Sequence, residues 1–270
     1  MKTYNIIVIT ISIFSLFNSC SVDDTQQVDQ KNWQLVWSDE FNQAQGTLPD
    51  TTKWIFDIGN SGWGNNELEY YTNRAENAST DGNGNLVITA KRENFGTAQF
   101  TSARIKTQGL FSQQYGRIEA RIKTPYGPGI WPAFWMLGNT INTEGWPQCG
   151  EIDIMELRGQ QPHIINGSLH GPGYSGANAI TNSYALQNSR FDIDFHIFAV
   201  EWNENYIDYF VDNFLYQRIN KSDVSGNWVY NQPFFIILNI AVGGNYVGFP
   251  TTQTPFPQKM YIDYVRVYKE

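Results

Sequence analysis

Short segments rich in β-branched and aromatic residues alternate with Gly, Asn, Asp and Pro along most of the chain. This pattern is typical of β-strands joined by tight turns. No segment combines helical periodicity with good caps over the length of a long helix. We therefore expect an all-β fold in which two antiparallel sheets pack as a sandwich. The predicted strands are residues 87–90, 101–106, 116–123, 195–202, 206–211, 234–242 and 261–268.

The alternation within segment 116–123 predicts which face of that strand is buried. Ile118 and Ala120 alternate with Glu119 and Arg121. Because successive side chains of a strand point to opposite faces, we expect one face in the core and the other in water.

The run from Gly150 to Glu156 places three carboxylates in an otherwise apolar segment. In a regular strand Glu151 and Asp153 share a face with Met155, whereas Glu156 points the other way. One inserted residue, a β-bulge, returns Glu156 to the face of the other two acids, and bulges recur beside active sites. A solvated acidic strand face is the alternative interpretation.

Three acids on one face repel one another, which raises at least one pKa and gives carboxyl groups of the same type different roles. Glycoside hydrolysis needs such a pair, because one carboxyl protonates the leaving oxygen while the other attacks the anomeric carbon or activates water. In retaining enzymes the two carboxyls lie about 5–5.5 Å apart. Two Glu side chains on one strand face can converge to that separation.

Aromatic residues make up 15% of the chain and include nine Trp. Rings with an apolar face and a polar edge suit the faces of pyranose sugars. The net charge is −8, and Lys and Arg are scattered, which argues against nucleic acid or an anionic membrane surface as a partner. Three His and two Cys offer no zinc-ligand spacing, and no nucleophile elbow or phosphate loop is present. We interpret Cys149 as an ordinary buried residue, and we expect a monomer.

The N-terminus begins with Lys2 and an apolar stretch over residues 6–17 that is too short to span a membrane and fits a signal peptide. Small or polar residues before Cys20 resemble a bacterial lipoprotein cleavage box, which predicts lipidation of Cys20 and a lipid anchor to the membrane. We therefore divide the chain into a lipoprotein-type signal peptide (1–19), a tether (20–32) and a catalytic β-sandwich domain (33–270). We expect an exported protein on the outer membrane or cell surface, with plain secretion as the alternative.

Four segments carry a resemblance to a known family: GWGNNELEYYT (62–72), GIWPAFWML (129–137), GWPQCGEIDIMEL (145–157) and GSLHGPGYSG (167–176). Together they resemble glycoside hydrolase family 16, and within it the laminarinase-like endo-β-1,3-glucanases, over residues 33–268. The resemblance implies a jelly roll of the concanavalin A type with a substrate cleft across its concave sheet. It also implies a neutral β-glucan polysaccharide as partner and no cofactor for catalysis. In the retaining mechanism of the family, Glu151 matches the nucleophile, Glu156 the general acid/base, and Asp153 the residue that orients Glu151.

The resemblance also predicts substrate-binding residues along the cleft, namely Asn66, Glu67, Arg104, Trp131, Trp135, His170 and Asn245. Trp131 and Trp135 lie four residues apart on a strand and hence on one face, either as sugar platforms or as core residues. Asn66 and Glu67 lie in a Gly-rich loop that the family uses at the glycone end, although a loop Asn-Asn is also ordinary turn chemistry.

Arg104 matches an Arg that reaches the sugar in the family, and an exposed strand charge is the alternative. His170 follows on the strand after the catalytic one, where it either hydrogen-bonds the substrate near Glu156 or is a satisfied core histidine. Asn245 belongs to the AVGGN segment, which resembles the loop that closes one end of the cleft. Tyr246 follows it where relatives often have Trp.

Many family members hold a structural calcium ion on the face away from the cleft. The resemblance places this ion at Glu40, Gly84 and Asp263. The nearby segment 81–85 lacks the Gly and the closing Glu of an EF-hand loop, so we interpret it as a hairpin turn.

The leading functional hypothesis is an endo-acting β-1,3-glucanase. A mixed-linkage β-1,3-1,4-glucanase shares its chemistry, but strict lichenases of the family resemble E-I-D-I-E without the inserted residue. A sulfated-galactan hydrolase would need clustered Lys or Arg in the cleft. A non-catalytic glucan-binding protein on the same fold is the third alternative, and relatives of that kind lack the catalytic Glu pair that this chain has.

Overall fold

The computed structural model describes residues 31–270. The predicted signal peptide, Cys20 and residues 20–30 of the predicted tether lie outside the described residues. Between residues 31 and 270, no helix has the length and apolar character that crossing a membrane requires.

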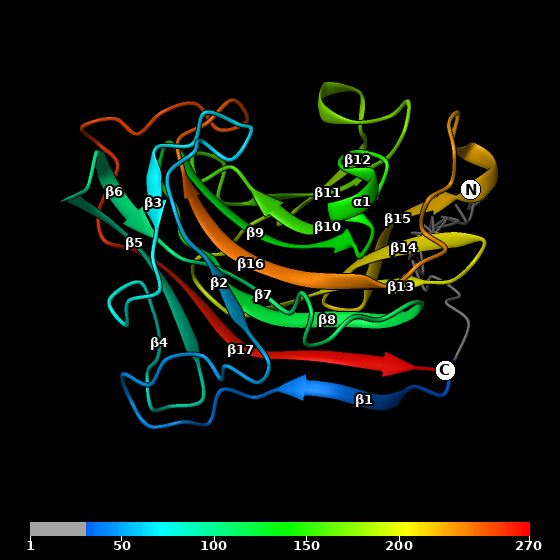
Figure 1. Ribbon diagram of the computed structural model, residues 1–270, viewed down its shortest axis with the longest axis horizontal. Coiled ribbons are helices and arrows are strands. Elements are labelled where there is room, and N and C mark those ends of the chain that lie inside the picture. Colours follow the sequence, from blue (N-terminus) through cyan, green and yellow to red (C-terminus); the bar gives the residue numbers. More distant parts are fainter. Residues whose placement is uncertain (1–30) are drawn as a thin grey trace, which may run out of the picture.

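Two β-sheets lie face to face and account for most of the fold (Figure 1). The larger, ten-stranded sheet has the order β15 (Phe214–Asn220), β14 (Tyr206–Val211), β13 (His196–Trp202), β8 (Gly116–Lys123), β17 (Gln258–Lys269), β5 (Leu86–Phe95), β6 (Ala98–Ser102) and β3 (Glu69–Tyr71). Two further strands join it, β1 (Gln34–Asp39) beside β17 and β4 (Ala78–Thr80) beside β5. The pairs of this sheet are antiparallel except β3 with β6, which is parallel.

The smaller, seven-stranded sheet has the order β12 (Ile180–Ala185), β11 (Ile164–His170), β10 (Glu151–Leu157), β9 (Ile130–Gly138), β16 (Phe234–Val242), β7 (Arg104–Lys106) and β2 (Ile55–Asp57). Short helical segments occur only in its connections and those of the larger sheet within the described residues: α1 (Ile141–Glu144), η1 (Gly176–Asn178) and η2 (Lys221–Asp223). The predicted all-β antiparallel sandwich is confirmed.

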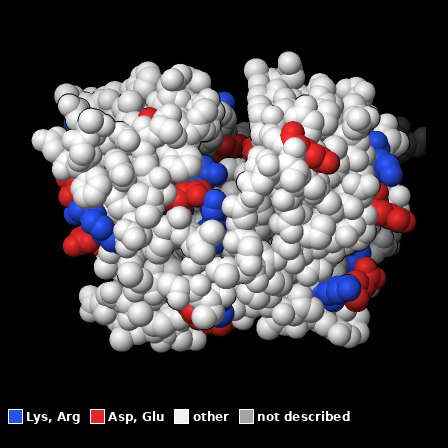
Figure 2. Space-filling view, in the orientation of Figure 1, with Lys and Arg blue, Asp and Glu red and all other residues white. Residues whose placement is uncertain are grey.

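The hydrophobic core fills the space between the sheets. Strand β8 contributes Ile118 and Ala120 from one side, and β16 contributes Ile236 and Leu238 from the other, all at most 1% exposed. Figure 1 shows β9 and β16 curving, so that the smaller sheet is concave on the side away from the larger one. Figure 2 shows a groove on this molecule that separates two lobes and holds acidic and basic side chains at its bottom.

Strands β8, β14 and β16 have the bounds that the sequence predicts, and the predicted hairpin turn at 81–85 is confirmed between β4 and β5. The prediction of one strand over residues 101–106 is wrong. The chain leaves the larger sheet after Ser102, passes through the fully buried Ala103, and enters the smaller sheet as β7. Because a crossing between sheets is a long-range event, the local alternation of side chains does not reveal it.

The prediction that one face of β8 is exposed to water is also wrong for the first half of the strand. Glu119 is 7% exposed and Arg117 is 9% exposed. Arg117 donates from Nε to Glu119 Oε2 over 2.8 Å and from Nη1 to Glu201 Oε1 over 3.0 Å. Opposite charges on β8 and on the neighbouring β13 therefore pair with one another and pack against the sheet, which excludes water.

Candidate active site

Strand β10 carries the three predicted carboxylates, and a bulge lies between the second and the third. On β11, Asp153 pairs with Ser168 and Glu156 pairs with Asn166, so three steps along β10 match two along β11. Ile154 and Met155 both turn into the core, where they are 1% and 0% exposed. Glu156 thereby returns to the face of Asp153, and the predicted bulge is confirmed.

Trp131 on β9 lies next to the last of these carboxylates. Its indole Nε1 donates a hydrogen bond to Glu156 Oε1 over 2.9 Å. Glu156 itself is 9% exposed. The hydrogen bond fixes the orientation of the Glu156 carboxyl, and Trp131 is therefore a cleft residue and not part of the core.

His170 on β11 lies beside the other two carboxylates, because its backbone pairs with Glu151. Its Nε2 is 3.1 Å from Asp153 Oδ2 and 3.7 Å from Glu151 Oε1. The sequence-based expectation named only Glu156 as its neighbour, whereas the ring lies beside Glu151 and Asp153 and its charge also acts on Glu156. The difference arises because β11 runs antiparallel to β10, which brings the end of β11 to the start of β10.

The ring of His170 has a defined tautomer. The backbone N–H of Gly176 donates to Nδ1 over 3.1 Å, so a neutral ring carries its proton on Nε2, facing the carboxylates. Oxygen and nitrogen atoms of Glu151, Asp153 and His170 all lie within 4.8 Å of one another, which is a spacing that a metal ion can use. A metal needs an unprotonated Nε2, however, and the Gly176 N–H opposes the shift of the proton to Nδ1. The cluster therefore suits proton chemistry better than metal binding.

The carboxyl groups of the cluster are poised to hold protons near neutral pH. Burial and the charge of Asp153 raise the pKa of Glu156 to about 8, and the same two causes raise that of Glu151 to about 8. Burial raises the pKa of Asp153 to about 8. Such close acids lose their protons as a coupled set, one after another. The Glu151 side chain is 16% exposed and that of Asp153 is 5% exposed, so the first charge costs the least desolvation at Glu151.

Trp135 and Arg104 form the cleft floor on the other side of β10. Asp153 pairs with Trp135 on β9. The guanidinium of Arg104 lies 4.7 Å from the ring of Trp135 and 5.0 Å from the ring of Trp63, and its Nε is 2.9 Å from Asp57 Oδ2. Arg104 is thus held between two indoles and an acid, which excludes the alternative of an exposed strand charge.

The loop that contains Asn66 and Glu67 meets the loop that contains Asn245. Asn66 Nδ2 donates to Asn245 Oδ1 over 2.9 Å, and Asn245 N donates to Asn65 O over 2.8 Å. Both side-chain amides are exposed. Gly244 has a φ of +118° and lies against Asn65 O, so a larger residue there would be strained and would separate the two loops. The structure brings Asn66 and Asn245 together at one edge of the cleft.

Asn166 and Arg158 lie near the catalytic strand although the sequence did not point to them, and both contact Tyr246. Tyr246 lies 4.9 Å from Trp131 between ring centroids and accepts a hydrogen bond from Asn166 Nδ2 over 2.8 Å. Asn166 pairs with Glu156 across the strands, and the guanidinium of Arg158 lies 4.2 Å from the ring of Tyr246. The signal that could have identified Asn166 is its position opposite the acid, which requires the strand register. Tyr246 supplies an aromatic face beside Trp131, although many relatives have Trp at the position of Tyr246.

The residues predicted to hold calcium are engaged in ion pairs. Glu40 makes a bidentate pair with Arg266 over 2.9 and 2.8 Å, which lowers the pKa of its carboxyl, and Asp263 pairs with Arg121. Gly84 lies near the side chain of Asn42. An ion at this position would have to displace the guanidinium groups, so the arrangement does not fit a bound calcium ion. Calcium binding stays a prediction from the family resemblance.

Cys149 precedes the catalytic strand and is fully buried and free, as predicted. Burial raises the pKa of its thiol to about 11, so it is not a reactive thiolate at neutral pH.

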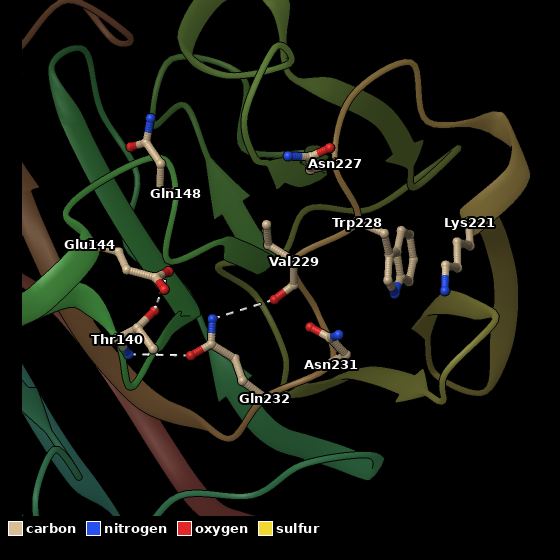
Figure 3. A pocket seen from close by; sticks show the side chains of 9 residues that line it. All are labelled: Thr140, Glu144, Gln148, Lys221, Asn227, Trp228, Val229, Asn231 and Gln232. Atoms are coloured by element: carbon tan, nitrogen blue, oxygen red, sulfur yellow. Dashed lines mark hydrogen bonds between the residues drawn. The ribbon is translucent and has the colours of Figure 1, made fainter.

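A second hollow of about 520 Å³ lies beside α1 (Figure 3). It is lined by Thr140, Glu144, Gln148, Lys221, Asn227, Trp228, Val229, Asn231 and Gln232. The side chain of Gln232 accepts from Thr140 N over 3.3 Å and donates to Val229 O over 3.4 Å and Cys149 O over 3.1 Å. No catalytic carboxylate lines this hollow. Gln232 instead braces the segment that leads into Glu151.

Comparison with known proteins agrees with this geometry. The profile of Glycosyl hydrolases family 16 matches residues 65–266. A β-glucanase from Rhodothermus marinus is 40% identical over 271 residues, which cover 96% of this chain and 94% of that protein. The laminarinase catalytic domain from Thermotoga maritima MSB8 has a TM-score of 0.85 at 49% identity, covering 89% of this chain and 99% of that domain.

Another relative is much longer than this chain. The clotting factor G alpha subunit of Tachypleus tridentatus is 45% identical over 244 residues, which cover 89% of this chain but 35% of that protein. This chain therefore spans about a third of that relative and nearly all of the Rhodothermus protein. Since the family profile matches most of the sequence and the bulged acidic strand lies in the cleft, the chain belongs to glycosyl hydrolase family 16.

Proposed function

We propose that this protein is an endo-1,3-β-glucanase that cleaves laminarin-type polysaccharide with retention of configuration. The observation that carries the proposal is the bulge of β10, which gathers Glu151, Asp153 and Glu156 on one face. The similarity of this chain to a β-glucanase and a laminarinase domain, over most of the length of each, supports the same reaction class. A non-catalytic glucan-binding role is disfavoured because both Glu residues of the catalytic pair are present, with Glu156 buried beside Trp131 and Glu151 partly buried beside His170.

The reaction needs two carboxyl groups and a water molecule, without a cofactor. In the first step the Glu151 carboxylate attacks the anomeric carbon, the bond from that carbon to the bridging oxygen breaks, and Glu156 gives its proton to that oxygen. In the second step Glu156 takes a proton from water, whose oxygen then displaces Glu151 from the anomeric carbon. Two displacements restore the β configuration. Asp153 lies between the two along the strand, and burial together with its charge raises the pKa of both Glu151 and Glu156.

The cleft fits a neutral chain. Of the cations beside the cleft, Arg104 is committed to Asp57 and two indole rings, and the guanidinium of Arg158 lies against the ring of Tyr246. A sulfated substrate would need free cations there. Trp131, Trp135 and Tyr246 offer aromatic faces, and Asn66 and Asn245 offer exposed amides that suit sugar hydroxyls. This combination supports a neutral β-glucan. A mixed-linkage glucan is the second candidate only because it shares the same chemistry.

Glutamine substitution tests the proposal. Glu151→Gln and Glu156→Gln should each lower turnover on laminarin by orders of magnitude, because each removes a group that acts in the transition state. Glu144→Gln is the matched control, since Glu144 is an exposed acid on α1. Circular dichroism and thermal melting check that all three variants fold. Near-normal turnover in either active-site variant would contradict the catalytic roles assigned to Glu151 and Glu156.

A panel of polysaccharides tests the substrate class. The wild-type protein should hydrolyse laminarin faster than lichenan and should leave agarose and carrageenan intact. Preference for lichenan would favour the mixed-linkage alternative, and cleavage of carrageenan would contradict the argument from the committed Arg104.

We also propose export and anchoring through a lipidated Cys20. This part rests on the sequence of residues 1–20 alone.

A further inference from the structure

A chain of buried hydrogen bonds runs beneath the cleft floor, away from the catalytic carboxylates. It begins at Trp135, whose indole Nε1 donates to Asn239 Oδ1 over 2.8 Å. Asn239 Nδ2 donates to the hydroxyl of Tyr71 over 3.1 Å, and that hydroxyl donates to Glu67 Oε2 over 3.0 Å. The chain ends at Asn65, whose Nδ2 donates to Glu67 Oε1 over 3.3 Å.

The direction of every bond in this chain follows from its first member. An indole N–H only donates, so the oxygen of Asn239 must face Trp135 and its NH₂ must face Tyr71. The oxygen of Tyr71 is then an acceptor, and its single proton is left for Glu67. Burial raises the pKa of Tyr71 well above its ordinary value, so the hydroxyl keeps that proton. Glu67 is the acceptor that completes the chain.

The inner members of the chain, between Trp135 and Asn65, are buried. Tyr71 is fully buried, Asn239 is 6% exposed and Glu67 is 9% exposed. Both oxygens of Glu67 already accept hydrogen bonds from the protein. A substrate hydroxyl therefore has little access to Glu67, unlike the exposed amides of Asn66 and Asn245.

The first member of the chain, Trp135, is part of the cleft surface. Trp135 pairs with Asp153 across β9 and β10, and the guanidinium of Arg104 lies against its ring. Asn239 lies on β16 between Ala133 of β9 and Arg104 of β7. The tilt of the Trp135 ring next to the catalytic strand is therefore set by the hydrogen bond to Asn239.

We propose that Glu67, Tyr71 and Asn239 are positioning residues that hold the indole of Trp135 as a sugar platform, and that Glu67 acts through this relay instead of binding the substrate. This inference rests on the proposed glucanase function. It assigns to these three residues an indirect effect on substrate affinity, through the position of Trp135. A platform that stacks on the sugar in both ground and transition states contributes uniform binding. Loosening it raises KM and leaves kcat nearly unchanged.

Tyr71→Phe tests the relay with a single missing hydroxyl. It leaves Asn239 Nδ2 without its acceptor and Glu67 Oε2 without its donor, whereas Asn65 still donates to Glu67 Oε1. Loss of such a bond next to a charged group corresponds to a roughly tenfold rise in KM for laminarin. The same variant should change kcat by less than about twofold. A purely structural role would lower the fraction of active enzyme, which reduces the apparent kcat and leaves KM unchanged. Tyr70→Phe is the matched control, because its hydroxyl lies one residue away on the same strand and the ring of Tyr70 packs against Phe95.

The direction of the relay gives a second test. Asn239→Asp keeps an acceptor for Trp135 but has no NH₂ for Tyr71, so it should raise KM as Tyr71→Phe does although its shape is the same. Glu67→Gln still accepts the Tyr71 proton and should stay near the wild-type KM, whereas Glu67→Leu should resemble Tyr71→Phe. Unchanged KM in Tyr71→Phe, or an equal loss in Glu67→Gln and Glu67→Leu, would overturn the relay.

A spectroscopic measurement separates this inference from the proposed function. The indole N–H resonance of Trp135, assigned by its absence in Trp135→Phe, should shift in Tyr71→Phe and Asn239→Asp and stay in place in Tyr70→Phe. If the protein hydrolyses no glucan but the resonance shifts, the proposed function fails and the relay stands. If the protein hydrolyses laminarin and the resonance stays in place, the relay fails alone.

Discussion

The bulge in β10 can be tested by deleting one residue, because both neighbouring strands already have the spacing of a regular strand. Between the partners of Asp153 and Glu156 there are two steps on β11, from Ser168 to Asn166. There are also two steps on β9, from Trp135 to Ala133. Deleting Met155 leaves two steps on β10 as well. The deletion should restore plain alternation and keep all three acids on the cleft face.

The cost of this deletion follows from the burial of Met155. Its side chain is 0% exposed and belongs to the main core. Removing a buried side chain of this size costs about 2–5 kcal/mol, out of a free energy of unfolding of about 5–15 kcal/mol. For a domain of this length that corresponds to a melting temperature lower by about 4–20 °C. The variant should therefore fold, with reduced stability.

Activity and melting together decide the outcome. Glucanase activity of the Met155 deletion should stay within about a hundredfold of the wild type, a loss that a small misplacement of Glu156 would cause. Met155→Ala is the control, since it creates a similar cavity and keeps the bulge. Deleting both Ile154 and Met155 turns Glu156 into the core and should abolish catalysis. If the single deletion is folded but as inactive as Glu156→Gln, the reasoning about the bulge is refuted.

Three further predictions concern single groups. Trp131→Phe removes the N–H that favours the charged form of Glu156, so the pKa of Glu156 should rise above about 8. The alkaline limb of kcat/KM against pH should then move up by about one unit, and a downward shift would contradict the assigned role. Glu69 is fully buried, and burial together with the charge of Glu67 raises its pKa well above its ordinary value, so wild-type stability should fall as pH rises above the unfolded-state pKa. Glu69→Gln keeps an acceptor for Val242 N and should gain stability relative to the wild type with rising pH in denaturant titrations; an equal difference at all pH values would mean that Glu69 is already charged. Cys20→Ala should release the protein from membranes or leave it unprocessed, and unchanged fractionation with lipid labelling would point to another tether.

The parts of the fold that the sequence predicts are those set by local alternation. Strands 116–123, 206–211 and 234–242 have the predicted bounds because each has a continuous apolar or alternating pattern and flanking turn residues. The bulge was also predictable, since the spacing of Glu151, Asp153 and Glu156 violates period two in a way that only an inserted residue repairs. These predictions need no knowledge of which strands are neighbours.

The remaining features depend on which strands are neighbours. The break at Ala103, the burial of Glu119 and the position of His170 all follow from pairing between distant segments. Asn239 is an instructive case, because it is a lone amide in the buried nine-residue strand 234–242. A polar residue in such a run must have a partner, so the sequence carried a signal there. The identity of its partners, Trp135 and Tyr71, required the fold.

The stereochemistry of the first product tests the central claim most directly. If Glu151 and Glu156 converge from one strand face, no space remains for an attacking water between them, and two displacements must occur. Time-resolved proton NMR of laminarin hydrolysis distinguishes the anomers of the newly formed reducing end before they equilibrate. Our account predicts that the β-anomer appears first and the α-anomer grows in by mutarotation. An α-anomer as the initial product would contradict the assignment of Glu151 as nucleophile.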